Sequence, residues 1–286
     1  MVIIDRRGDS QIHIVTDSTA QLTNKEIEDN HITVVPLAVT LEGQHYQDGV
    51  DVSRAEFSRR LREDQQFPKT SQPSLGQFVE TYQRIAKPND QILSIHIGSV
   101  LSGTVQTAQM AAEQVPVQVA VLDSGLTDRG LAFVVLKAAE LIQTEHDLAT
   151  IMAELKAYMN KITLTCFVNS LDYLVKGGRA NRAIGFVSTL IKLKLELGMP
   201  NGELKVLHKS RGEKGMQKMI DQVTADIINH PQITRVGLSY VDSHADTDRI
   251  EAVLKKKRPD LEIVNRLTSP TIMTHVGPNG FAVIFV

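Results

Sequence analysis

Short runs of β-branched and other apolar residues alternate along the chain with longer stretches in which apolar positions recur every three or four residues. The short runs are typical of buried strands, and the longer stretches are typical of amphipathic helices that cover a sheet. In the first half, strands are expected at 12–16, 32–36, 91–97 and 117–122, with a hairpin over 39–46. This alternation predicts an α/β fold around a parallel sheet.

The second half of the chain has a less regular pattern. Two helices, expected at 128–143 and 146–160, end near a boundary at residue 161, which predicts two domains, 12–160 and 161–286. Beyond the boundary the pattern indicates a mixed sheet covered by helices. Its strands are expected at 162–168, 190–197, 204–208, 235–241, 262–266 and 282–286, and its helices at 214–229 and 245–257.

Composition argues against a nucleic-acid-binding function and against a disulfide-stabilised fold. The chain has 286 residues, 42% of them hydrophobic, and its 31 Lys and Arg against 33 Asp and Glu give a formal net charge of -2. A charge balance this close to neutral argues against a general nucleic-acid-binding surface. Cys166 is the single cysteine, so no intrachain disulfide can form, which fits a reducing cytoplasm.

The N-terminal residues and the most apolar stretch carry no signal for export or membrane insertion. The opening MVIIDRRGDSQ has an apolar run only from Val2 to Ile4, so we expect a flexible leader. The apolar stretch 130–142 is interrupted by Lys137 and Glu140 and is shorter than the ~20 residues that cross a bilayer. We therefore expect a cytoplasmic protein without a transmembrane segment.

Polar or glycine-rich turns follow three of the predicted strands: Asp17 to Thr19, Gly98 to Thr104, and Asp123 to Gly125. In a parallel sheet such turns meet at one edge, where ligands generally bind. For the first turn, helix capping is an equally good interpretation, because Ser, Thr and Asp satisfy free backbone amides.

Two loops have the chemistry to hold an anion. The segment Thr70 to Ser74 offers several hydroxyl and amide side chains around a rigid proline, although capping by Ser74 alone would explain part of it. Gly98 to Thr104 resembles a phosphate-binding P-loop, but Thr104 stands where the lysine is needed. Helix-start amides at Gly103 and Thr104 suit a singly charged carboxylate better than a triphosphate.

Two further segments combine flexible backbone with cationic or titratable side chains. Lys176 to Arg179 contains two glycines, and an ordinary helix stop is the alternative interpretation. His275 is expected in a turn bounded by Gly277 and Pro278, where a functional and a structural role are equally weighted. Common local zinc spacings and a GxSxG elbow are missing, and Cys166 is expected to be a buried, inert thiol.

The order of these motifs along the chain resembles that of the DegV family. The resemblance covers about Ile12 to Val286, and although each motif is weak alone, the ordered set is specific. The motifs are Thr16-Asp17-Ser18, Thr70-Ser71-Gln72-Pro73-Ser74, Leu101-Ser102-Gly103-Thr104, Asp123-Ser124, Gly177-Gly178-Arg179 and His275 with Gly277-Pro278.

The resemblance implies a two-domain α/β fold, with an N-terminal three-layer α/β/α parallel sheet and a C-terminal two-layer α/β mixed sheet. It also implies a long-chain fatty acid, such as palmitate, stearate or oleate, in a tunnel at the domain interface. Some members are the fatty-acid-binding subunit of bacterial fatty acid kinase and hand the acid to a separate ATP-dependent subunit that makes acyl phosphate. No catalytic residue, metal or cofactor is implied for this chain, while transient contact with a membrane surface is allowed.

By this similarity, individual residues acquire expected roles. Those expected around the carboxylate are Thr70, Ser71, Ser102, Gly103, Thr104 and His275. Arg179 is expected at the docking surface for the kinase subunit or at the site of phosphoryl transfer.

The sequence departs from the family pattern at Lys192 to Leu195, which lacks a Lys-Pro pair, and in its 277–280 ending. Two other classes of function stay open on the residues. One is an autonomous small-molecule kinase or hydrolase that uses the 98–104 loop. The other is a lipid-sensing regulator without a kinase partner.

Overall fold

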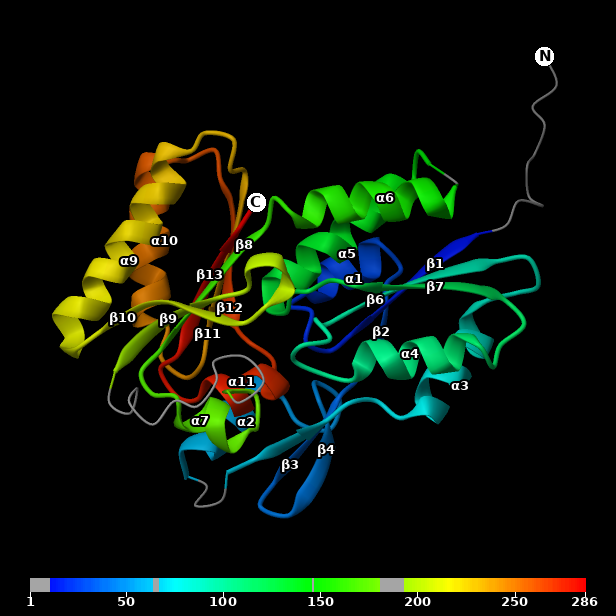
Figure 1. Ribbon diagram of the computed structural model, residues 1–286, viewed down its shortest axis with the longest axis horizontal. Coiled ribbons are helices and arrows are strands. Elements are labelled where there is room, and N and C mark those ends of the chain that lie inside the picture. The colour runs from blue at the N-terminus through cyan, green and yellow to red at the C-terminus, as the bar shows by residue number, and fades with distance from the viewer. Residues whose placement is uncertain (1–10, 64–66, 146, 181–192) are drawn as a thin grey trace.

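The computed structural model describes residues 11–63, 67–145, 147–180 and 193–286 (Figure 1). Its first lobe is built on a four-stranded parallel sheet, as the alternation predicts. In spatial order the strands are β2 (Thr33–Val35), β1 (Ile12–Asp17), β6 (Gln91–His96) and β7 (Gln118–Asp123). The ends of β1, β6 and β7 therefore meet at one edge, together with the turns that follow them.

Helices cover both faces of this sheet. On one face, α3 (Leu75–Ile85) and α4 (Thr104–Ala112) bury side chains against the strands, and the capping box at Ser74 begins α3. On the other face lie α1 (Asn24–Asp29) and α5 (Asp128–Ile142), with α6 (Leu148–Met159) packed on α5. The first lobe is thus the expected three-layer α/β/α arrangement.

The second lobe contains a six-stranded mixed sheet, also as expected. Only β11 and β12 pair in parallel, and the other neighbours are antiparallel. The order is β10 (Lys205–Ser210), β9 (Lys194–Gly198), β8 (Thr163–Val168), β13 (Phe281–Phe285), β11 (Arg235–Tyr240) and β12 (Glu262–Leu267). Helices α9 (Gly212–Asn229) and α10 (Ala245–Lys257) pack on the same face of this sheet, and the short 3-10 helix η1 (Pro200–Gly202) follows β9.

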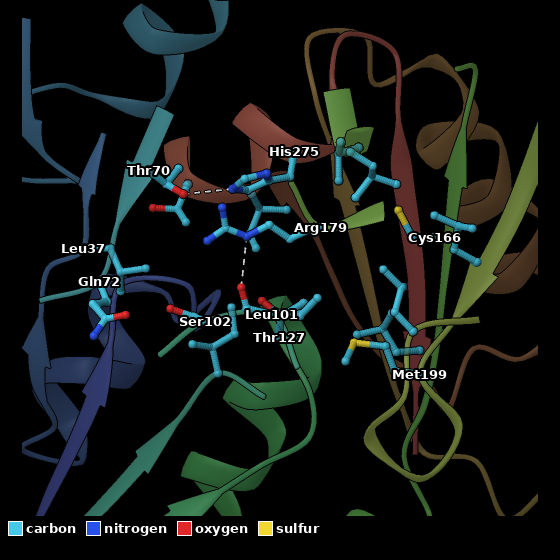
Figure 2. Close-up of a pocket in the computed structure, with 18 of the residues that line it drawn as sticks. Leu37, Thr70, Gln72, Leu101, Ser102, Thr127, Cys166, Arg179, Met199 and His275 are labelled. Atoms are coloured by element: carbon cyan, nitrogen blue, oxygen red, sulfur yellow. Dashed lines mark hydrogen bonds between the residues drawn. The ribbon is translucent and has the colours of Figure 1, made fainter. Parts of the chain in front are cut away.

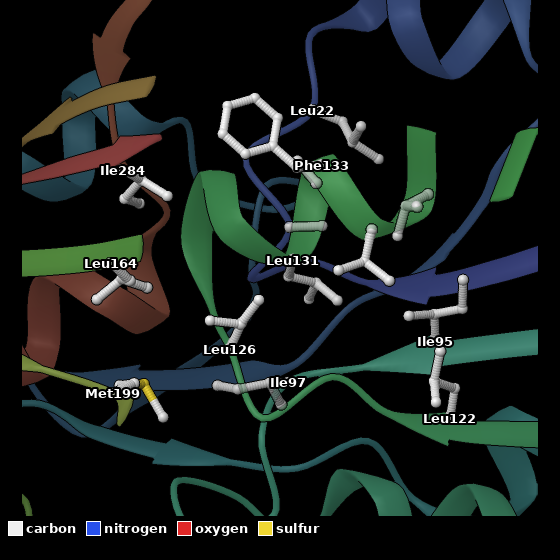
Figure 3. Close-up of a cluster of buried hydrophobic side chains, with 14 of the residues drawn as sticks. Leu22, Ile95, Ile97, Leu122, Leu126, Leu131, Phe133, Leu164, Met199 and Ile284 are labelled. Atoms are coloured by element: carbon white, nitrogen blue, oxygen red, sulfur yellow. The ribbon is translucent and has the colours of Figure 1, made fainter. Parts of the chain in front are cut away.

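Helix α5 lies between the two sheets and joins their cores. It contacts β1 and β6 of the first sheet and β11 and β13 of the second. Figure 3 shows one continuous apolar cluster that includes Ile95 from the first sheet, Leu131 from α5 and Ile284 from the second sheet. An apolar helix of this length is explained by its burial on two sides. Within the part of the chain that the structure describes, no helix is both long and apolar enough to span a bilayer.

A third, antiparallel sheet lies beside the two lobes, in the order β4 (Gln44–Gln47), β3 (Ala38–Leu41), β5 (Lys69–Ser71). The predicted hairpin is confirmed as β3 and β4, and α2 (Arg54–Glu63) packs its apolar residues against it. The interpretation of Thr70 and Ser71 as loop residues is wrong, because β5 pairs with β3. Three residues are too few to show a strand period, and the pairing partner is far away in the sequence.

The expected turn around His275 is also wrong, because this residue lies in the last turn of α11 (Pro270–Val276). Ser269 caps the helix by accepting a hydrogen bond from the Ile272 amide, and Pro270 occupies its first turn. Gly277 ends it with a φ of 78°. A serine cap followed by proline is a helix-start signal that played no part in the prediction. The prediction of a turn depended on Gly277 and Pro278 instead.

Some expectations fall on residues outside the described ranges. They concern the leader over residues 1–10, the helix start at His146, the first residues of the strand expected at 190–197, and Lys192. The described part of that strand is β9, which begins at Lys194.

Candidate functional site

A cavity lies between the lobes, where β5, α11 and the start of α4 face β8 and β9 (Figure 2). About 710 Å³ of space there is not filled by protein atoms, counted out to where it opens to solvent. Its polar lining residues are Thr70, Ser71, Gln72, Ser102, Thr127, Arg179, Thr271 and His275, and its apolar ones include Leu164, Leu174, Leu197, Met199 and Leu204.

The polar lining residues lie on the side of the first lobe, α7 (Asp172–Lys176) and α11, together with apolar ones such as Leu37 and Leu101, whereas the side formed by the second sheet is apolar. In Figure 2, Thr70, His275 and Arg179 lie together at one end, while Cys166 and Met199 lie toward the second sheet. None of the described lining residues is acidic. The cavity is therefore suited to a molecule with a small polar or anionic group and a long apolar part.

His275 is held at the polar end by Thr70, whose Oγ1 lies 2.9 Å from the imidazole Nε2. The other ring nitrogen, Nδ1, is buried and has no hydrogen-bond partner among the residues that the structure describes. Burial, with the positive charge of Arg179 nearby, lowers the pKa of His275 to about 3. The imidazole is therefore neutral near pH 7, so it can act as a hydrogen-bond partner without adding a charge.

Ser102 reaches the cavity just before α4 begins. It is buried, and its Oγ lies 2.9 Å from the Thr104 hydroxyl oxygen. Gly103 and Thr104 are not among the lining residues. The Gln72 side chain lies over Gly103, since a Cβ there would be 2.2 Å from Gln72 Oε1. The structure thus brings Thr70, Ser102 and His275 to one cavity, with the α4 amides just behind it.

Arg179 connects the end of α7 with the loop before α4. Its Nε donates to the Leu101 carbonyl oxygen at 3.1 Å, and its Nη1 donates to the Gly177 carbonyl oxygen at 2.8 Å. Gly177 is the C-cap of α7, so the helix-stop interpretation is correct for the glycine. The same turn brings a guanidinium to the cavity wall, so the two interpretations of this segment are compatible.

Among the described lining residues, four with a polar or thiol side chain were missing from the expected site: Gln72, Thr127, Cys166 and Thr271. Gln72 belongs to the Thr70 to Ser74 motif, so the sequence already offered it as a candidate. Thr271 lies in the first turn of α11, so recognising this helix start would have made it a candidate as well. Cys166 was expected in an apolar strand, and burial raises the pKa of its thiol to about 12, so it stays protonated near neutral pH. What the strand pattern could not show is that this position of β8 faces a cavity.

The turn after β1 serves the fold. Asp17 is fully buried, and its carboxylate accepts hydrogen bonds from the Thr19 amide and hydroxyl and from the Ile97 amide. It also lies 3.0 Å from His96 Nδ1. The turn therefore has a structural role, but the helix-capping interpretation is wrong, because the next helix, α1, begins at Asn24 and is capped by Thr23.

The amides of the 98–104 loop are largely occupied by the protein itself. Ser99 donates to the Asp123 carboxylate, and Leu101 and Ser102 both donate to the Gly98 carbonyl oxygen. A phosphate-binding loop needs such amides free, so the geometry agrees with the missing lysine. No group of three or more His, Cys, Asp or Glu residues suited to a metal ion occurs among the described residues.

Fold and cavity together define a two-lobed α/β protein whose internal cavity has one polar and one apolar end. The family model described as "Uncharacterised protein, DegV family" matches residues 11–286. The chain therefore belongs to the DegV family. A DegV domain-containing protein of Streptococcus pyogenes is 36% identical over 278 residues, which cover 96% of this chain and 98% of the relative.

Solved structures of the family are also similar. A fatty-acid-binding DegV family protein from Thermus thermophilus is 30% identical, with a TM-score of 0.85 over 96% of this chain and 99% of the other. DegV from Bacillus subtilis, a fatty acid binding protein, is 27% identical, with a TM-score of 0.89 over 97% of this chain and 99% of the other. Similar proteins with this fold thus bind fatty acids.

Proposed function

We propose that this protein binds a long-chain fatty acid in the cavity between its lobes. The observation that carries the proposal is the division of the wall, with hydroxyls, a neutral imidazole and a guanidinium at one end and apolar side chains at the other. Burying about 15 methylenes at ~0.8 kcal/mol each gives an upper bound of roughly 12 kcal/mol before ordering costs. Fatty acid binding by similar DegV proteins supports the same assignment.

The carboxylate is placed at the polar end, near Thr70, Ser71, Ser102 and His275. Because a buried carboxylate must be hydrogen-bonded, the hydroxyls act as donors, and the amides of Gly103 and Thr104 contribute partial positive charge from the start of α4.

The Thr70 and His275 pair supplies a directed donor. If Nε2 carries the imidazole proton, His275 donates to Thr70 Oγ1, and the Thr70 hydroxyl hydrogen is free to point at the carboxylate. This tautomer leaves the unpartnered Nδ1 as a bare acceptor rather than a buried N–H. A hydrogen-bond relay of this kind favours a ligand atom that accepts a hydrogen bond, such as a carboxylate oxygen, over a ligand atom that donates one.

The acid is presented to a separate ATP-dependent kinase subunit, which phosphorylates the carboxylate to acyl phosphate. In this proposal the chain is a cytoplasmic carrier subunit that needs no cofactor and performs no catalysis itself. Residues 12–160 contribute the polar loops, and residues 161–286 contribute most of the apolar wall. Arg179, at the cavity wall beside the loop before α4, acts where the kinase subunit meets the carboxylate.

Mass spectrometry of denatured protein tests the ligand directly. The purified protein is expected to release an acid such as palmitate, stearate or oleate. Thr70→Ala and Ser102→Ala are each expected to weaken binding of the acid, because each removes a hydrogen bond to a charged group worth about 1 to 3 kcal/mol, roughly 5- to 150-fold in affinity.

Thr40→Ala is a matched control, since Thr40 lies on the neighbouring strand β3 but not in the cavity wall. It is expected to leave the affinity unchanged. A folded protein that neither carries nor takes up any acyl chain would reject the proposal. Unchanged affinity in both Thr70→Ala and Ser102→Ala would reject the placement of the carboxylate.

A further inference from the structure

A second hollow lies against the end of the cavity that is formed by the second lobe. We call it the outer groove. It is open to solvent, and its wall mixes polar residues, such as Ser99, Asp123 and Asn201, with apolar ones, such as Ile162 and Leu207. Of the lining residues in the described part of the chain, two, Leu164 and Met199, belong to both the cavity and the outer groove. These two side chains therefore form a partition, one residue thick, between the cavity and the solvent-exposed outer groove.

The two halves of the partition differ in how easily they can move. Leu164 is a residue of β8, which is paired on both sides in the middle of the six-stranded sheet. Met199 follows the end of β9 and is the residue before η1. Methionine has an unbranched side chain with three rotatable bonds, so it can change conformation at lower cost than leucine in a strand.

Below the partition, the backbones of the two lobes meet directly. Gly125, in the turn after β7, has a φ of 60°, and a Cβ there would lie 3.1 Å from the Gly202 Cα. Because this contact is between backbones, no rotation of a side chain can open it. Met199 is then the movable part of the boundary, and Figures 2 and 3 show its side chain extending from the second lobe toward the first.

From these contacts we infer that Met199 sets the upper limit on the length of the acyl chain that the cavity accepts. This inference rests on the proposed function. With the carboxylate at Thr70 and His275, the methyl end of the acid runs toward β8 and β9 and stops against Met199. A longer chain has to displace Met199 and continue into the outer groove, where further methylenes stay partly exposed to solvent because the groove is open. The preferred ligands are therefore acids whose acyl chain ends inside the cavity.

The test is a comparison of Met199→Ala with Leu197→Ala. Leu197 is a buried residue of β9 that lines the cavity but not the outer groove. Both variants enlarge the cavity, but only Met199→Ala connects it to the groove. Dissociation constants are measured for a saturated series from palmitate through stearate and arachidate to behenate, with thermal unfolding as a check that each variant is folded.

For the wild type, affinity is expected to fall once the chain exceeds the cavity. In Met199→Ala, the affinity for behenate relative to palmitate is expected to rise by about tenfold or more, since a misfit of a methylene or two in an apolar pocket is worth about 10- to 200-fold. Leu197→Ala is expected to change that ratio by less than about threefold. An unchanged ratio in Met199→Ala, or the same increase in both variants, would overturn the inference. A wild type that binds none of these acids would instead refute the proposed function.

Discussion

His275 and Asp48 are buried titratable residues at opposite ends of helix α11. His275 lies in its last turn, and Asp48 contacts its first turn. Their pKa values shift in opposite directions. Burial lowers the pKa of His275 to about 3, with Arg179 adding to the effect. Burial raises the pKa of Asp48 to about 6, although its carboxylate accepts hydrogen bonds from the Thr271 amide and hydroxyl. Both groups therefore resist the charged form, and both link the stability of the cavity wall to pH.

The two shifts predict opposite contributions to stability in acid. His275 binds its proton more weakly in the folded than in the unfolded protein, so stability is lost as pH falls below about 6.5, and at pH 5 the loss is about 2 kcal/mol. Asp48 binds its proton more tightly when folded, so stability is gained as pH falls through about 6, by about 1 kcal/mol at pH 5.

Urea unfolding of the ligand-free protein at pH 7 and pH 5 measures both contributions. His275→Gln, which cannot be protonated in this range, is expected to lose about 2 kcal/mol less than wild type between the two pH values. Asp48→Asn is expected to lose about 1 kcal/mol more, because it lacks the compensating proton uptake. Identical pH dependence in wild type and both variants would show that neither group is shifted.

At the scale of elements, the polar end of the cavity depends on the close approach of α7 and α11. A Cβ on Gly177 would lie 2.2 Å from His275 Nδ1 and 2.9 Å from the Tyr173 carbonyl oxygen. On α11, a Cβ on Gly277 would lie 2.3 Å from the Tyr173 ring. The Gly-Gly-Arg motif thus serves the site in two ways: it ends α7, and it leaves room for the imidazole.

Gly177→Ala is expected to displace His275 and weaken fatty acid binding by about tenfold, with a loss of stability of about 1 to 3 kcal/mol from overpacking. The backbone of Gly177 has a φ of -75° that alanine adopts freely, so the effect comes from contact and not from backbone strain. Isothermal titration with an acyl ligand and thermal unfolding measure the two effects.

Gly76→Ala is the control, because Gly76 lies in α3 and a Cβ there meets nothing within 4 Å. It is expected to keep the affinity and to gain up to about 1 kcal/mol in stability from helix propensity. If Gly177→Ala binds the acid as tightly as Gly76→Ala does, the close packing of α7 on His275 has no part in binding.

At the scale of the whole molecule, buried polar contacts hold the lobes in one arrangement. The Asp128 carboxylate, at the start of α5, accepts hydrogen bonds from the hydroxyls of Ser239 and Thr268 in the second lobe. Gln21 Nε2 donates to the Ser239 hydroxyl oxygen at 2.7 Å. Directional contacts of this kind fix the relative position of the two sheets more narrowly than apolar packing alone, and the cavity lies in the same seam.

The kinase step belongs to this scale, because it needs a second protein. Arg179→Ala is expected to reduce fatty acid affinity by less than about tenfold, since Arg179 Nε and Nη1 already donate to backbone carbonyl oxygens of the protein. Phosphorylation of the bound acid by a bacterial fatty acid kinase subunit with ATP is expected to fall by at least about 100-fold, the scale on which an arginine acts in phosphoryl transfer.

Acyl phosphate formation at saturating acid separates these two effects. Arg62→Ala is a suitable control, because this exposed arginine of α2 pairs with Asp242 and does not line the cavity. Full turnover by Arg179→Ala would exclude Arg179 from transfer. No turnover with the wild type would indicate a fatty acid carrier without this partner.

Local patterns were sufficient for the main sheets. Strands β1, β6 and β7 and the mixed sheet follow from apolar runs that need no knowledge of their partners. The pattern failed at β5, since a three-residue strand is defined by its pairing with β3. It also failed at α11, a seven-residue helix that is followed by a glycine and a proline, which are typical of a turn.

The sequence by itself determined the α/β class, the sheet elements and the polar residue types available for an anion, because these depend on periodicity and side-chain chemistry within short windows. Residue patterns did not show that Thr70, Ser102, Arg179 and His275 come together, because they lie in four separate segments of the chain, although the family resemblance implied a shared site. The tertiary structure brings all four to one cavity. It also decided that Cys166 and Met199 face that cavity, since a strand or loop pattern shows burial but not what lies on the buried side. The cavity arises where the two sheets pack around α5, so no short stretch of sequence could reveal it.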